Sequence, residues 1–198
     1  MRYVYVTLIG CCVLLMTSSA WPKDKKNPAM DMQAVMETYA KLATPSEVHA
    51  RMASRAGSWS TTTKEWTDPK KPPEESTGAC EHTMLLGGRF LRQECSGDMM
   101  GQPYTGIGIL GYNDHTKKYV STWMDSMGTG IFYMEGKADK TGHTITHKGH
   151  YDDPMEGAMK LRAVTKLVDA DHEIFEMYGT GKSGKETKMM EIIYTHKH

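Results

Sequence analysis

Residues 80–95 read CEHTMLLGGRFLRQEC, and they carry the clearest structural signal in the chain. Two runs of residues typical of β-strands flank Gly87-Gly88, and a glycine pair in that setting is the signal for a two-residue type I′ hairpin turn. When the hairpin is drawn with that turn, Cys80 lies directly opposite Cys95. The stretch therefore predicts two antiparallel strands that bring two cysteines face to face.

The facing cysteines predict a disulfide bond. We place the pair on a hydrogen-bonded rung of the ladder, where the two Cα atoms lie about 5.5 Å apart, within the range that a disulfide spans. A bond between Cys80 and Cys95 would close a short loop and add roughly 3 kcal/mol in the chain-entropy model. Two buried free thiols are the alternative.

The period-two pattern of this hairpin continues in both directions along the chain. Turn residues rich in Gly, Asn, Asp and Pro separate short runs at even spacing, which is typical of an all-β barrel or sandwich. No helical pattern of 10–15 residues interrupts the runs, which argues against parallel βαβ units. The predicted strands are 58–67, 77–86, 89–96, 103–112, 117–125, 129–137, 142–151, 157–168, 172–180 and 186–196.

One or two short helices are predicted over residues 31–56, before a barrel domain at 57–198. Thr44-Pro45 followed by Glu47 matches a capping box, with Thr44 as the N-cap and Pro45 at the first helical position. An earlier helical stripe has apolar residues at the spacing i, i+3, i+4 and i+7: Met32, Val35, Met36 and Tyr39.

The first residues predict export. Arg2 precedes the uncharged, apolar stretch 3–16, and small residues lead up to Ala20, so 1–20 is interpreted as a cleaved signal peptide. The apolar stretch is shorter than the ~20 residues that a membrane helix needs. Residues 21–30 are rich in Pro and charge, which favours a disordered tether. We expect a periplasmic or extracellular protein with no stable membrane span after cleavage.

Two other interpretations of the same segment stay open. Leu8-Ile9-Gly10-Cys11 looks like a lipoprotein cleavage site, and the segment could also remain as an uncleaved anchor.

The charge of the chain argues against one class of partner. Twenty-four Lys and Arg balance 24 Asp and Glu, and without a basic surplus we expect no nucleic-acid partner.

Several motifs, taken in chain order, resemble a known family: Gly57-Ser58-Trp59, Leu86-Gly87-Gly88-Arg89-Phe90-Leu91, Gly108-Ile109-Leu110-Gly111-Tyr112-Asn113, Lys118-Tyr119-Val120, Trp123-Met124-Asp125-Ser126 and Gly184-Lys185-Glu186. Together they resemble the bacterial domain of unknown function 1579 family (DUF1579), over residues 46–197. The resemblance implies a calycin-like barrel, related in shape to lipocalins, which the ten predicted strands would form as an antiparallel sheet. It implies no activity.

The resemblance also implies a role for Trp59. In calycins the Trp of a Gly-x-Trp motif on the first strand closes one end of the barrel, and a basic residue near the last strand packs over it. The family is usually basic at the last strand, often with Arg, whereas this chain has His196 there. His196 or Lys197 is the candidate for that contact.

A barrel of this size could enclose one small apolar ligand, and a binding or scaffold module is our leading interpretation. In the alternative, side chains fill the interior and the protein works through its surface. Arg89 and Asp125 would orient the polar end of a ligand. The predicted lining is Trp59, Trp66, Met84, Arg89, Trp123, Met124, Asp125, Phe132, Tyr133 and Met177.

Asp125 is the most informative carboxylate. It shares a strand face with Trp123, because residues two apart point the same way. If that face is interior, Asp125 requires a partner, for which Arg89, Arg92 or Arg162 are candidates. If it is exterior, Asp125 is an ordinary acid at the end of a strand.

The sequence contains no catalytic motif, and we assign no catalytic residue, metal ligand or cofactor. An enzyme acting at the barrel mouth would use Asp125 with His147 or His150, and it would require a carboxylate and a histidine within hydrogen-bond reach. Soft-metal binding is a third hypothesis, because 17 methionines include the pair Met124 and Met127. The alternative is that these methionines fill the core.

Histidine pairs are a further metal or haem candidate. His143 and His147 stand four residues apart on one predicted strand, and His196 and His198 stand two apart on another. If the two strands were neighbours, the pairs could build a zinc or haem site. Histidines on solvent-facing strands are the alternative.

Overall fold

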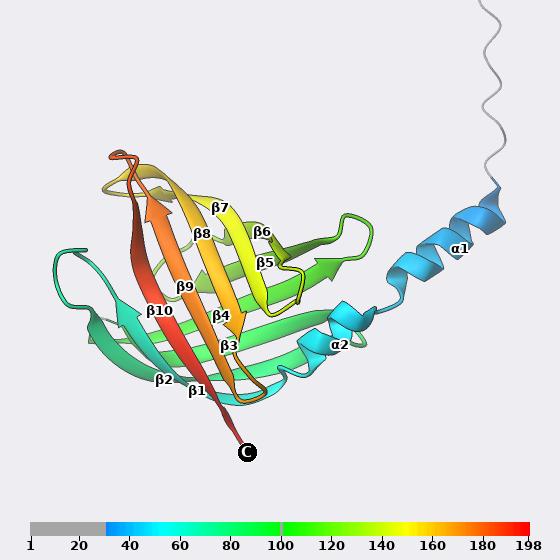
Figure 1. The fold of residues 1–198 in the computed structure, drawn as a ribbon, viewed down its shortest axis with the longest axis horizontal. Coiled ribbons are helices and arrows are strands. Elements are labelled where there is room, and N and C mark those ends of the chain that lie inside the picture. Colours follow the sequence, from blue (N-terminus) through cyan, green and yellow to red (C-terminus); the bar gives the residue numbers. More distant parts are fainter. Residues whose placement is uncertain (1–30, 100) are drawn as a thin grey trace, which may run out of the picture. The chain divides into compact units, whose positions relative to one another are not determined.

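The computed structural model describes residues 31–99 and 101–198, and within these ranges ten antiparallel strands close into a barrel (Figure 1). Each strand pairs with its neighbours in the chain, and the first pairs with the last, so the sheet has no free edge. The predicted fold class and all ten predicted strands are confirmed. The strands are β1 (Gly57–Glu65), β2 (Glu74–Leu85), β3 (Phe90–Met99), β4 (Gln102–Asn113), β5 (Lys118–Asp125), β6 (Phe132–Ala138), β7 (Thr144–Asp153), β8 (Gly157–Leu167), β9 (His172–Thr180) and β10 (Glu186–Lys197).

Two helices precede the strands, α1 (Met32–Ala43) and α2 (Glu47–Ala53). Ser46 caps α2: its backbone is extended (φ −93°, ψ −179°), and its N–H donates to Nδ1 of His49 at 3.0 Å. The predicted capping box on Thr44 is therefore wrong by two residues, because the chain stays extended through Ser46. Neither helix has the length and apolarity to cross a bilayer. The predicted signal peptide and tether, residues 1–30, lie outside the described residues.

The hairpin around Gly87-Gly88 has the predicted register. Cys80 pairs with Cys95 and Leu85 with Phe90. The predicted two-residue turn is wrong, because the loop runs from Leu86 to Arg89. Leu86, Gly87 and Gly88 all have positive φ (50°, 66° and 87°), a conformation that glycine adopts readily, so the glycine pair allows the wider loop.

A disulfide joins Cys80 to Cys95 across β2 and β3, as predicted. The two Cα atoms are 4.0 Å apart, which is the closer spacing of a non-hydrogen-bonded rung. The predicted hydrogen-bonded rung is therefore wrong. The bond links residues 15 apart, and it contributes about 3 kcal/mol in the chain-entropy model.

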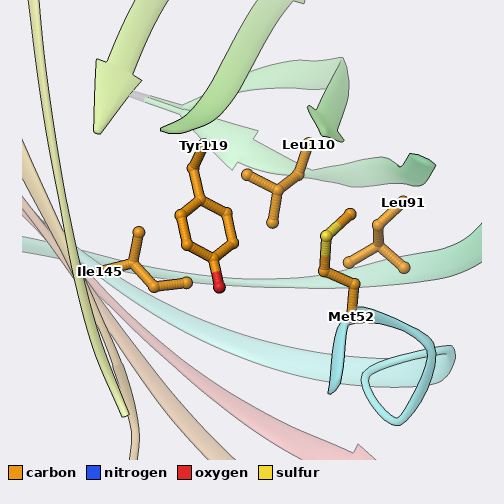
Figure 2. Close-up of a cluster of buried hydrophobic side chains, with 5 residues drawn as sticks. All are labelled: Met52, Leu91, Leu110, Tyr119 and Ile145. Carbon is orange, nitrogen blue, oxygen red and sulfur yellow. The ribbon is translucent and has the colours of Figure 1, made fainter. Parts of the chain in front are cut away.

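One end of the barrel is packed shut, and we call it the closed end. Met52 of α2 packs there against Leu91, Leu110, Tyr119 and Ile145, four residues of the barrel wall (Figure 2). A second buried cluster at this end holds Trp59, Cys80 and Tyr194. The opposite end carries the β1–β2, β3–β4, β5–β6, β7–β8 and β9–β10 loops, and we call it the open end.

Candidate ligand cavity

The barrel encloses a cavity of about 250 Å³ between the closed-end core and the open end. Its side walls are apolar and come from eight of the ten strands, β3 to β10. The apolar side chains that line it are Met99, Leu110, Trp123, Phe132, Met134, Ile145, Ala163, Phe175, Met177, Met190 and Ile192. The interior is therefore hollow, in contrast to the filled barrel that was the alternative.

Four of the predicted lining residues do line this cavity: Trp123, Asp125, Phe132 and Met177. Met124 and Tyr133 lie beside them in the chain and therefore point to the outer face, since successive strand residues alternate. Tyr133 is 52 % exposed, and its hydroxyl donates to Oε1 of Glu135 at 3.0 Å. Strand alternation therefore explains why Met124 and Tyr133 are not part of the cavity wall, although each adjoins a residue that is.

The other four predicted lining residues lie away from the cavity. Trp59 is buried beneath it in the closed-end core, and Met84 packs against the cluster around Met52. Trp66 follows β1 and lies 5.7 Å from the ammonium of Lys188. Arg89 is in the β2–β3 loop, where Nε donates to the carbonyl oxygen of Ala43 at 3.0 Å.

The position of the Trp123 ring depends on two glycines of the neighbouring strand. Gly106 and Gly108 on β4 are buried, and a Cβ at either position would collide with the Trp123 indole. The ring therefore lies flat against the backbone of β4. The sequence Gly106-Ile107-Gly108 carries this signal, because glycines spaced by two leave one face of a strand without side chains.

Asp125 faces the interior and forms a polar cluster at the open end. Its Oδ2 accepts hydrogen bonds from Trp123 Nε1 at 3.1 Å and from the Tyr104 hydroxyl at 3.4 Å. Its Oδ1 accepts from the backbone N–H of Met127 at 3.0 Å. The expectation that an arginine would pair with Asp125 is wrong, because these neutral donors take that place.

A second carboxylate, Glu65, lies near the same cluster. It lines a small hollow of about 60 Å³ that shares Tyr104 and Trp123 with the main cavity. Burial, and then repulsion from Glu74, raise the pKa of Glu65. Burial also raises the pKa of Tyr104, and the charges of Asp125 and Glu65 raise it further. Tyr104 therefore remains a neutral hydrogen-bond donor.

Asp125 and Glu65 form no ion pair in the described part of the chain. Within residues 31–99 and 101–198, neither Asp125 nor Glu65 has a basic nitrogen at ion-pair distance. Both side chains are half-buried, which weakens their solvation. A positively charged group placed between them would be stabilised.

The cavity floor holds a buried ion pair that the sequence analysis did not predict. Arg55 Nε and Nη2 donate to the two carboxylate oxygens of Glu173, both at 2.7 Å. Arg55 is 8 % exposed and Glu173 2 %. Strand alternation in the sequence could have identified Glu173 as an inward-facing residue, because it shares a face of β9 with Phe175 and Met177.

The Arg55 carbonyl ties this ion pair to the closed-end core. It accepts hydrogen bonds from Trp59 Nε1 and from His82 Nδ1, both at 3.1 Å. Nε2 of His82 accepts in turn from the Gln93 side chain at 3.1 Å. Burial and, second, the charge of Arg55 lower the pKa of His82 to about 4, so this histidine is neutral at neutral pH.

His147 also lines the cavity, but it does not form the pair that the enzyme hypothesis requires. Its Nε2 is buried and has no hydrogen-bond partner among the described residues. Burial and the charge of Arg55 lower the pKa of His147 to about 4. His150 lies on the outer face of β7 and is exposed.

The methionines and histidines that the sequence offered as metal or haem ligands are distributed over the barrel. Met124 and Met127 are exposed. β7 and β10 are separated in the barrel by β8 and β9, so the two predicted histidine pairs do not lie on neighbouring strands. His196 packs edge-on against Trp59, with ring centroids 4.7 Å apart, in the place where the resemblance implies a basic residue.

Solved structures with the same fold include two with TM-scores above 0.5. Rv2717c from M. tuberculosis has a TM-score of 0.57 and 14 % identity, over 78 % of this chain and 100 % of that one. The S-type phycobiliprotein lyase CPES from Guillardia theta has a TM-score of 0.53 and 14 % identity, over 76 % of this chain and 93 % of that one. Identities this low show the shared calycin-like fold alone.

No curated protein matches the sequence. A family model described as a protein of unknown function (DUF1579) matches residues 44–196, which include α2 and nearly all of the barrel. The expected resemblance is confirmed: the chain belongs to the DUF1579 family.

Proposed function

We propose that this protein binds one small molecule with an apolar body and a positively charged head group. The observation that carries the proposal is the cavity of about 250 Å³, with apolar walls and, near its open end, two carboxylates that have no ion-pair partner among residues 31–99 and 101–198. The apolar body would lie between Phe132, Met134 and Phe175, and the head group would lie near Asp125.

The volume limits the size of the ligand. An apolar cavity of roughly 150 Å³ holds a benzene molecule, and drug-sized ligands occupy about 300–1,000 Å³. A cavity of about 250 Å³ falls between these values. It suits a single ring or a short alkyl chain.

The charges favour a cationic head group over an anionic one. At the floor, the charge of Arg55 is neutralised by Glu173, so it is not available to an incoming carboxylate. At the open end, Asp125 and Glu65 would attract a cation, and the faces of Trp123 and Tyr104 would add cation–π attraction. An anion would meet like charge there and lose its hydration shell.

Three six-carbon probes test this proposal: hexylammonium, hexanol and hexanoate, titrated into the whole chain by calorimetry. We expect hexylammonium to bind more tightly than hexanol and hexanoate to bind least. Ser121→Phe should abolish binding of all three probes, because Ser121 lines the cavity and a phenyl ring would fill it. Asp125→Asn should weaken hexylammonium about tenfold, a loss of about 1.4 kcal/mol, and leave hexanol unchanged.

Met124→Phe is the matched control, because Met124 is on the same strand and faces outward. It should bind all three probes like the unaltered chain. If Ser121→Phe binds hexanol as well as the unaltered chain does, the cavity is not the binding site. If hexanoate binds better than hexylammonium, the charge assignment is wrong.

We also propose that the protein is exported. The disulfide between Cys80 and Cys95 supports this, since such bonds persist in oxidising compartments, and so does the uncharged apolar stretch 3–16. Expression of the full-length chain in a bacterium should give a product in the periplasm or medium that begins at Trp21. Intact mass after cell fractionation measures this, and an unprocessed chain in the cytoplasm would contradict it.

A further inference from the structure

A cluster of three metal-ligating side chains lies at the closed end, away from the cavity lining. Asp171 precedes β9, and His196 and His198 lie at the end of β10. One ligand atom from each of the three lies within 4.8 Å of the other two. We propose that these residues bind a divalent transition-metal ion of the zinc type.

The three side chains already converge. Nε2 of His198 is 3.0 Å from Oδ1 of Asp171. The rings of His196 and His198 have centroids 5.0 Å apart, because residues two apart on a strand share a face. The backbone N–H of His196 donates to the carbonyl oxygen of Asp171 at 2.8 Å, which holds the β8–β9 loop against β10.

His196 is held in place by the closed-end core. Its ring packs edge-on against Trp59, and Gly57 leaves room for it, since a Cβ at Gly57 would collide with Nε2 of His196. Nδ1 of His196 is buried and has no hydrogen-bond partner in the described chain. A buried imidazole nitrogen without a partner is costly, and a metal bond to Nδ1 would offset that cost.

The donor set fits the proposed ion. Two imidazole nitrogens and one carboxylate oxygen are a zinc-type set, and three protein ligands leave a position for water or another ligand. Tetrahedral zinc with bonds near 2.1 Å places its ligand atoms about 3.4 Å apart. The three ligand atoms lie within 4.8 Å of one another, and His198 Nε2 is 3.0 Å from Asp171 Oδ1, so small side-chain rotations would bring the three atoms to this spacing.

Calorimetric titration of Zn²⁺ into the metal-free whole chain tests the site. We expect one ion per chain, and at least tenfold weaker binding in His198→Gln and in Asp171→Asn. The side chain of His198 is 73 % exposed, so His198→Gln does not threaten folding. His150→Gln is the control, because His150 is an exposed histidine on β7 that lies outside the cluster, and it should bind Zn²⁺ with unchanged affinity.

Cu²⁺ gives a second readout, because a bound Cu²⁺ quenches a nearby indole and Trp59 lies 4.7 Å from the His196 ring. Saturable quenching of tryptophan fluorescence should occur in the unaltered chain and in His150→Gln, and it should be lost in His198→Gln. Equal Zn²⁺ affinity in the unaltered chain and in His198→Gln would overturn the proposal. The result is independent of the cavity probes, since none of the three ligands lines the cavity.

Discussion

Glu173→Ala is expected to destabilise the barrel by about 3–5 kcal/mol, because it leaves the charge of Arg55 buried without a partner. Both hydrogen bonds from the guanidinium would be lost, and Arg55, which is 8 % exposed, has little access to bulk water that could replace them. Urea unfolding followed by circular dichroism measures the change in the free energy of unfolding.

The surface pair of Arg162 and Glu186 is the matched control. It has the same bidentate geometry, with donor–acceptor distances of 2.8 and 2.7 Å, but its side chains are 31 % and 42 % exposed. Glu186→Ala should cost less than about 1 kcal/mol, as for other solvent-exposed ion pairs. Equal losses in the two variants would show that burial of the Arg55–Glu173 pair has no energetic consequence.

Trp59→Ala is expected to lower the free energy of unfolding by a similar amount, about 3–5 kcal/mol, the range for removing a large buried aromatic side chain. Trp59 is 1 % exposed and packs against His82, Tyr194 and His196. Its Nε1 also donates to the Arg55 carbonyl, so its loss loosens the floor of the cavity. Thermal and urea unfolding of the disulfide-bonded protein would measure the effect.

Trp66→Ala is the control for Trp59→Ala. Trp66 is half-buried after the end of β1, and Lys188 lies 5.7 Å from its ring. Its removal should cost no more than about 1 kcal/mol, the value of an exposed cation–π contact. If Trp59→Ala were as mild as Trp66→Ala, Trp59 would not close the barrel as the fold implies.

Much of the fold could be predicted because its signals are local. Turn residues and period-two alternation identified ten strands, and the hairpin around Gly87-Gly88 placed Cys80 opposite Cys95. The same alternation put Trp123 and Asp125 on one face, and that face is the interior. The turn itself and the cap of α2 were misplaced, because both depend on backbone angles that several residue types tolerate.

The floor of the cavity could not be predicted, because its groups come from distant parts of the chain. Arg55 and Glu173 are separated by 118 residues and meet only after β1 has paired with β10 and β10 with β9. A charged residue in an alternating strand is usually taken as solvent-facing. Only the partner, which is invisible in the sequence, makes an inward orientation acceptable.

The order of residues along each strand is enough to show which side chains share a face, because the stereochemistry of an extended chain sets that period residue by residue. The depth of each inward side chain was decided only by the tertiary structure. Met84 and Met177 both face inward, yet Met84 packs into the closed-end core and Met177 lines the cavity. The physical reason is that closing the barrel fixes the tilt and stagger of its strands, and these set the height of each residue along the barrel axis.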